Sequence, residues 1–125
     1  MTQEDKELLI KDLCARLPYG VVVNVKGFDF DFKDKLTQIY NGYGCSIQVT
    51  NNMPYGIEQV KPYLFPMSSM TEEQKRDYQY ITERWMNNPV YSISDSFDWL
   101  NRNHFDYRNL IEKSLALDAT GLGIY

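Results

Sequence analysis

The chain contains a single histidine, His104, so any acid–base chemistry that uses an imidazole has one candidate. Asp98 and Asp106 lie close to it in the sequence, and either carboxylate could orient the ring as in a catalytic triad. No serine or cysteine is placed by a motif to act as the nucleophile. A lone histidine at the end of a helix is more often a cap or a packed polar residue. We therefore assign no catalytic residue and keep a small hydrolase-like enzyme centred on His104 as an alternative.

The aspartates of residues 28–34 raise the question of a calcium site. An EF-hand loop that begins at Asp29 needs glycine at its sixth position and glutamate at its twelfth, where this chain has Asp34 and Tyr40. The spacing therefore excludes an EF-hand. The alternation instead predicts a strand whose phenylalanines (Phe28, Phe30 and Phe32) face the core while its aspartates face water.

The remaining candidates for metal or cofactor binding lack the spacing that such sites need. Cys14, Cys45 and His104 form no paired ligand motif of the zinc type. The glycine pairs at residues 42–44 and 121–123 precede no phosphate-binding helix. We expect no metal and no cofactor, and we expect the two cysteines to be free buried thiols in a reducing compartment.

Tyrosine is the residue type that exceeds expectation, with ten copies in 125 residues. Exposed tyrosines suit protein interfaces because they bury a large rigid area and keep a polar group. The alternative is that they are half-buried rim residues. We predict a contact surface for another protein, or for a second copy of the chain, built from tyrosines and from the extended segment 61–67. Its predicted binding residues are Tyr43, Tyr55, Tyr63, Phe65 and Arg108, and Tyr80, Tyr91 and Tyr125 are further tyrosines that a core does not require.

Charge and hydropathy argue against two classes of partner, nucleic acids and membranes. The net charge is −4 and no basic cluster is present, so nothing replaces the counterions of nucleic-acid phosphates, and nucleic-acid binding is disfavoured. Weak association of single-stranded nucleic acid with the aromatic residues 28–32 is kept as a third hypothesis. The acidic start of the chain is unlike a secretory signal, and no apolar run could span a membrane, so we expect a cytoplasmic protein.

The elements that must position these residues form a single α+β domain over residues 1–125. Thr2 caps an amphipathic helix that ends at Pro18, with Leu9, Leu13 and Cys14 on its apolar face and Asp12 on its polar face. Period-two alternation then predicts a meander of four or five antiparallel strands, with a hairpin turn at residues 41–44 and an SH3-like half barrel as one form of it.

The C-terminal half is predicted to be helical. Residues 61–66 are an extended connector, because each residue before a proline is pushed out of the helical region. A capping box of Thr71 and Gln74 begins a second helix that ends near residue 88. A third helix starts at residue 94 or 95, Asp106 caps a short fourth helix over residues 107–113, and residues 119–125 are irregular.

Two stretches of the chain resemble a known family. They are residues 61–73 (KPYLFPMSSMTEE), and residues 97–101 (FDWLN) with 104–117 (HFDYRNLIEKSLAL). The sequence is similar there to short uncharacterised proteins of Bacteroides-like gut bacteria, often encoded among prophage or mobile-element genes. The chain departs from the family pattern at Phe65, where the family has arginine, and at Asn109 and Ser114, where it has glycine. The resemblance implies a context but no activity, and it implies a folding role in which Asp106 caps and Arg108 forms an ion pair.

Together these observations favour a non-enzymatic interaction or accessory protein of phage or mobile-element origin.

Overall fold

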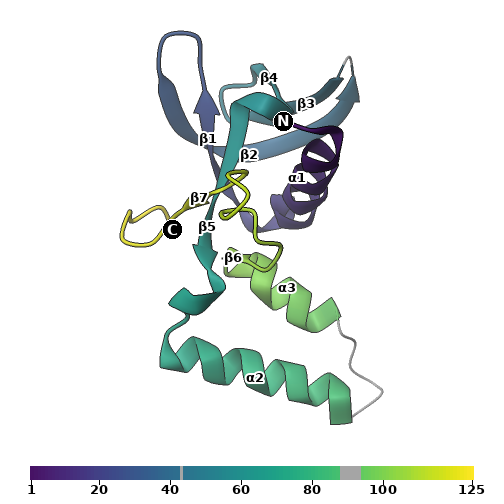
Figure 1. Ribbon diagram of the computed structural model, residues 1–125, viewed down its shortest axis with the longest axis vertical. Coiled ribbons are helices and arrows are strands. Elements are labelled where there is room, and N and C mark those ends of the chain that lie inside the picture. Colours follow the sequence, from purple (N-terminus) through teal and green to yellow (C-terminus); the bar gives the residue numbers. More distant parts are fainter. Residues whose placement is uncertain (43, 88–93) are drawn as a thin grey trace.

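The computed structural model describes residues 1–42, 44–87 and 94–125, so the predicted tyrosines at positions 43 and 91 lie outside the described residues. The protein has the predicted α+β class, with an N-terminal helix, a mostly antiparallel sheet and two C-terminal helices (Figure 1). The helices are α1 (Gln3–Arg16), α2 (Glu72–Asn87) and α3 (Ser94–Arg102). The strands are β1 (Val22–Lys26), β2 (Asp31–Gly42), β3 (Gly44–Val49), β4 (Pro54–Gly56), β5 (Val60–Pro66), β6 (Phe105–Asp106) and β7 (Leu117–Asp118).

The seven-stranded sheet is open, with strand order β4-β3-β2-β1-β5-β6 and with β7 paired to β5. Strands β1 to β5 pair antiparallel, whereas β6 and β7 run parallel to β5. The predicted meander is therefore present as β1 to β4. The first and last strands of this order do not pair, so the described strands show no barrel.

Helix α1 forms as the sequence predicts. The Thr2 hydroxyl accepts a hydrogen bond from the Asp5 amide, and Leu9 and Leu13 are fully buried against the sheet. Two expectations for this helix are wrong. Cys14 is exposed rather than buried, and Asp12 is fully buried rather than solvated. The buried face of α1 includes Asp12, unlike the predicted apolar face, because this carboxylate has cationic partners inside the protein.

The predicted strand through residues 28–32 is also wrong. The two-residue tip between Gly27 and Phe30 joins β1 to β2, and the Gly27 amide donates to the Phe30 carbonyl at 3.2 Å. Phe28 is fully exposed and Phe30 is 71% exposed, and only Phe32 reaches the core. A turn interrupts the chain here, so the alternation of phenylalanine and aspartate does not determine which side chains are buried.

Residues 61–66 are extended, as predicted, but they belong to β5 rather than to a connector. This strand lies between β1 and β6 in the sheet and runs from the sheet toward the helices (Figure 1). Tyr63 and Leu64 are buried within it. The sequence did not predict a strand inside the sheet here, because Pro62 and Pro66 lack the amide donors that pairing between strands normally uses.

The helical half is shorter than predicted. The capping box of α2 is present, with the Gln74 amide bound to the Thr71 hydroxyl at 3.1 Å and the Thr71 amide bound to the Gln74 side chain at 2.9 Å. No helix forms over residues 107–113, which are turns. Asn109 and Ser114 adopt φ of 59° and 61°, and these left-handed residues stop a helix from propagating.

The buried apolar residues form two clusters. The larger one lies between α1 and the sheet and is built from Leu9, Leu13, Val23, Ile47 and Leu64, among others. The smaller one joins α3 to the end of β5 and contains Met70, Trp99, Leu100 and Phe105. Across the parts of the chain that the structure describes, no helix is long and apolar enough to cross a membrane.

Candidate functional site

His104 follows α3 and lies at the junction of α1, β5 and the end of the chain. It has a φ of 62°, and only 8% of the residue is exposed. The ring of Tyr125 stacks on it at a centroid distance of 3.6 Å and an interplanar angle of 9°. Its Nδ1 atom is buried without a hydrogen-bond partner. Burial, and secondarily the nearby Arg16 guanidinium, lower the pKa of His104 to about 4, so the ring is neutral at pH 7.

Neither predicted carboxylate partner is placed to orient this ring. Asp106 is buried, and its two oxygens accept the amides of Leu110 and Ile111 at 2.9 Å each. Asp98 is exposed on α3. Among the described residues, no carboxylate lies within ion-pair distance of His104. A hydrolase centred on His104 requires an accessible ring and an orienting carboxylate, and the geometry supplies neither.

Arg108 belongs to an internal ion-pair network rather than to a surface. Its Nη1 donates to Asp12 Oδ1 at 2.7 Å, and Arg16 Nε donates to Asp12 Oδ2 at 2.8 Å. Arg16 Nη2 reaches the Phe105 carbonyl at 2.6 Å, and its Nη1 is buried without a partner. Arg108 therefore forms an ion pair, as predicted, whereas Asp106 caps no helix and instead holds the turn through the Leu110 and Ile111 amides. The roles of Asp12 and Arg16 were missed, although their i,i+4 spacing beside Leu9 and Leu13 was visible.

Among the described residues, the predicted aromatic binding residues Tyr55, Tyr63 and Phe65 lie wholly or partly inside the fold. Tyr63 is only 6% exposed, and the Lys33 ammonium lies 5.9 Å from its ring centroid. Phe65 is half-buried and makes tilted ring contacts with Phe105 and Tyr125. Tyr55 is half-buried at the margin of the larger cluster. Residues 62–64 are buried and the other residues of segment 61–67 are half-buried, so this segment contributes mainly to the interior.

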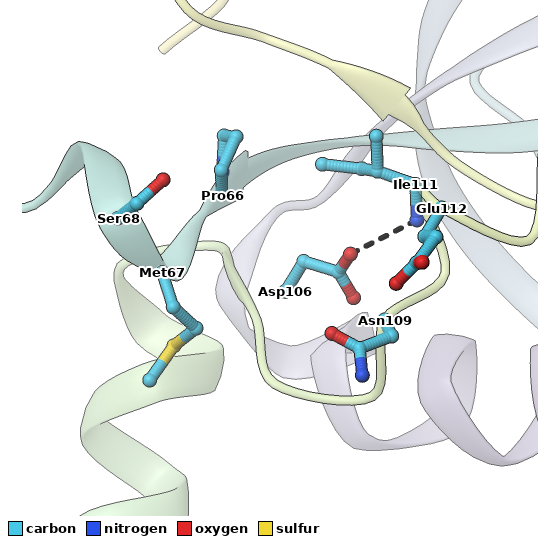
Figure 2. Close-up of a pocket in the computed structure, with 7 residues that line it drawn as sticks. All are labelled: Pro66, Met67, Ser68, Asp106, Asn109, Ile111 and Glu112. Atoms are coloured by element: carbon cyan, nitrogen blue, oxygen red, sulfur yellow. Dashed lines mark hydrogen bonds between the residues drawn. The ribbon is translucent and has the colours of Figure 1, made fainter.

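A pocket of about 330 Å³ opens beside Asp106 (Figure 2). Its lining is partly apolar and partly acidic: Pro66, Met67, Ser68, Asp106, Asn109, Ile111 and Glu112. Figure 2 shows the Asp106 carboxylate hydrogen-bonded to the Ile111 amide, so this carboxylate stabilises the turn. In the described part of the chain, no group of three or more histidines, cysteines and carboxylates could hold a metal ion.

The most exposed aromatic residues lie at the β1–β2 tip. The rings of Phe30 and Phe32 are 6.3 Å apart, and those of Phe32 and Tyr55 are 5.8 Å apart, both edge-on. A line of aromatic rings thus runs from the core through Tyr55 and Phe32 to the exposed Phe30. Figure 1 shows that this hairpin projects away from α2 and α3. We call Phe28, Phe30, Phe32 and Tyr55 the aromatic strip.

Comparison with protein-family models, with curated proteins and with solved structures finds no match to this chain.

Proposed function

We propose that this protein is a non-enzymatic interaction protein and that it binds a protein partner through the aromatic strip. The supporting observation is the exposure of Phe28 and Phe30 at the end of a two-residue turn. Apolar side chains of this size are usually buried when the fold alone determines their position, and an exposed pair on a rigid element suits an interface.

The hairpin is built to hold these rings outward. Gly27 allows the close approach of the Phe30 carbonyl, and Phe32 and Tyr55 anchor the base of the strip against the core. The Asn51 side-chain amide donates a hydrogen bond to the Tyr55 hydroxyl, with a distance of 2.8 Å between nitrogen and oxygen. A preorganised strip loses little conformational entropy on binding, which favours affinity.

A photo-crosslinking residue at position 28 tests the proposal in the organism that encodes the protein. We expect one discrete crosslinked adduct, whose mass distinguishes a second copy of the chain from a different protein. A Phe30→Ser substitution in the same molecule should reduce the adduct at least tenfold, since it removes the neighbouring ring.

The matched control carries the crosslinking residue at position 80, where Tyr80 is exposed on α2 and lies over Arg84. This position should give no adduct of the same mass. Equal adducts from positions 28 and 80, or none from position 28 in folded protein, would contradict a role for the strip.

The mobile-element context is a separate part of the proposal, and it is supported by the family resemblance. Asn109 and Ser114 both have a positive φ, a conformation that suits the glycine of the family pattern, and this supports the resemblance itself.

A further inference from the structure

Residues 119–125 form a strap that is fastened at its two ends. At one end the buried Ala119 donates its amide to the Leu64 carbonyl at 2.8 Å. At the other end Tyr125 stacks on His104. Residues 120–123 between them are exposed, and no atom lies within 4 Å of a Cβ placed on Gly121 or Gly123. The middle of the strap therefore has little packing that would resist its movement.

The Tyr125 hydroxyl takes a place in the sheet itself. The β1–β5 register pairs Val23 with Pro62 and Asn24 with Lys61, so the next pair along is Val22 with Tyr63. At this point the Val22 amide donates to the Tyr125 hydroxyl at 2.9 Å, and the hydroxyl donates to the Tyr63 carbonyl at 2.8 Å. A side chain thus bridges two strands where a backbone hydrogen bond would otherwise continue the ladder.

His104 under the strap is poorly placed to carry a charge. Its ring has Tyr125 on one face, its Nδ1 atom has no partner, and the positive guanidinium of Arg16 is close enough to disfavour an imidazolium. Lifting Tyr125 would hydrate the ring. No comparable rearrangement is available to Arg16, which is fixed in α1.

We propose that the strap is an acid-released latch: protonation of His104 displaces Tyr125 and frees the backbone groups of Val22 and Tyr63. Release would leave the Val22 amide and the Tyr63 carbonyl, which face each other between the paired strands β1 and β5, to bind water in place of the hydroxyl. This inference is independent of the aromatic strip.

The charged groups around His104 set the direction of the effect. Arg16 from α1 opposes protonation, and its charge is partly balanced by Asp12, which also pairs with Arg108. The Asp106 carboxylate, from β6, accepts hydrogen bonds from the Leu110 and Ile111 amides. Burial raises the pKa of Tyr125 to about 12, so its hydroxyl keeps the proton that it donates to Tyr63.

The closed form binds the His104 proton weakly because burial and Arg16 lower its pKa to about 4, whereas a hydrated imidazole has a pKa near 6.5. Lowering the pH from 6.5 toward 4 therefore favours the open form, by up to about tenfold for each pH unit. More than about one unit above pH 6.5 the ring is neutral in both forms, and pH has no effect on the latch.

Amide hydrogen exchange measured by NMR between pH 7 and pH 4 tests the latch. After correction for intrinsic exchange rates, the protection of the Val22 amide should fall at least tenfold over this range, while Ile47 and Val49 in the sheet remain protected. A His104→Asn variant keeps a residue that tolerates positive φ but cannot be protonated, and its Val22 protection should not change with pH.

A Tyr125→Phe variant should lose Val22 protection already at pH 7, because it retains the ring but not the bridging hydroxyl. Tyr80→Phe, an exposed tyrosine on α2, is the matched control and should leave Val22 unaffected. The proposal is overturned if Val22 and Val49 lose protection together, which would be global unfolding. It is also overturned if His104→Asn retains the acid response.

Discussion

Two arginine side chains share one buried carboxylate in this protein. Asp12 and Arg16 have no exposed surface, and Asp12 accepts hydrogen bonds from both Arg16 and Arg108. Arg16 also binds the Phe105 carbonyl, far along the chain. A buried carboxylate with two cationic partners is costly to disrupt, since removal of its charge leaves the fully buried Arg16 guanidinium without a counter-ion.

We therefore expect Asp12→Asn to lower the free energy of unfolding by about 3–5 kcal/mol, measured by urea denaturation at pH 7. The reason is that Arg16 would keep its charge in the interior without a counter-ion. The comparison variant is Glu72→Gln, which removes an exposed ion pair with Lys75 and should change stability by less than about 0.5 kcal/mol. Similar effects of the two substitutions would show that the network does not stabilise the fold.

At the scale of elements, the β1–β2 hairpin shows how one glycine sets the position of exposed side chains. A methyl group at position 27 would lie 2.6 Å from the Phe30 carbonyl oxygen, so the turn must open to accept it. Gly56 differs, because a Cβ there would meet only the Gln59 side-chain oxygen at 3.6 Å, which is an ordinary contact.

Gly27→Ala should destabilise the protein by about 1–3 kcal/mol because the added atom overlaps with backbone. It should also reduce crosslinking from position 28, since the turn that carries this position next to Phe30 must open. Gly56→Ala should be neutral or stabilising by up to about 1 kcal/mol, because its backbone suits alanine and the substitution restricts the unfolded chain. Thermal unfolding of the two variants provides the measurement, and an unaffected Gly27→Ala would refute the clash.

At the scale of the whole molecule, the described residues form two apolar clusters that share structural elements. Strand β5 contributes Leu64 to the larger cluster, and Phe65 packs against the smaller one. Arg16 connects α1 to Phe105, and stacked rings connect Tyr78, Trp99 and Phe105. Because these links run through buried groups, neither cluster can open without exposing part of the other.

We accordingly expect the chain to unfold as one cooperative unit. A Trp85→Phe variant leaves Trp99 as the only tryptophan and makes its fluorescence a probe of the smaller cluster. Its urea transition should coincide with that of far-UV circular dichroism, which reports on the whole molecule. Two transitions with separate midpoints would contradict a single domain.

Much of the fold was predictable where the signals are local. Thr2 caps α1, Thr71 and Gln74 begin α2, and the alternating valines form β1, as their sequence patterns predict. The candidate site was less accessible, because whether His104 is open or sealed depends on Tyr125, which no local pattern connects to it.

The sequence by itself determined the α+β class, the N-terminal helix and the presence of a mostly antiparallel sheet, since caps and periodicity act over a few positions. Only the tertiary structure decided what becomes of the residues that could do chemistry. His104 is sealed by Tyr125, Asp106 is used by a turn, and Arg108 is paired with Asp12. It also placed Phe28 and Phe30 in solvent. The physical reason is that burial and pairing depend on partners distant in sequence, as the bond from Arg16 to Phe105 illustrates.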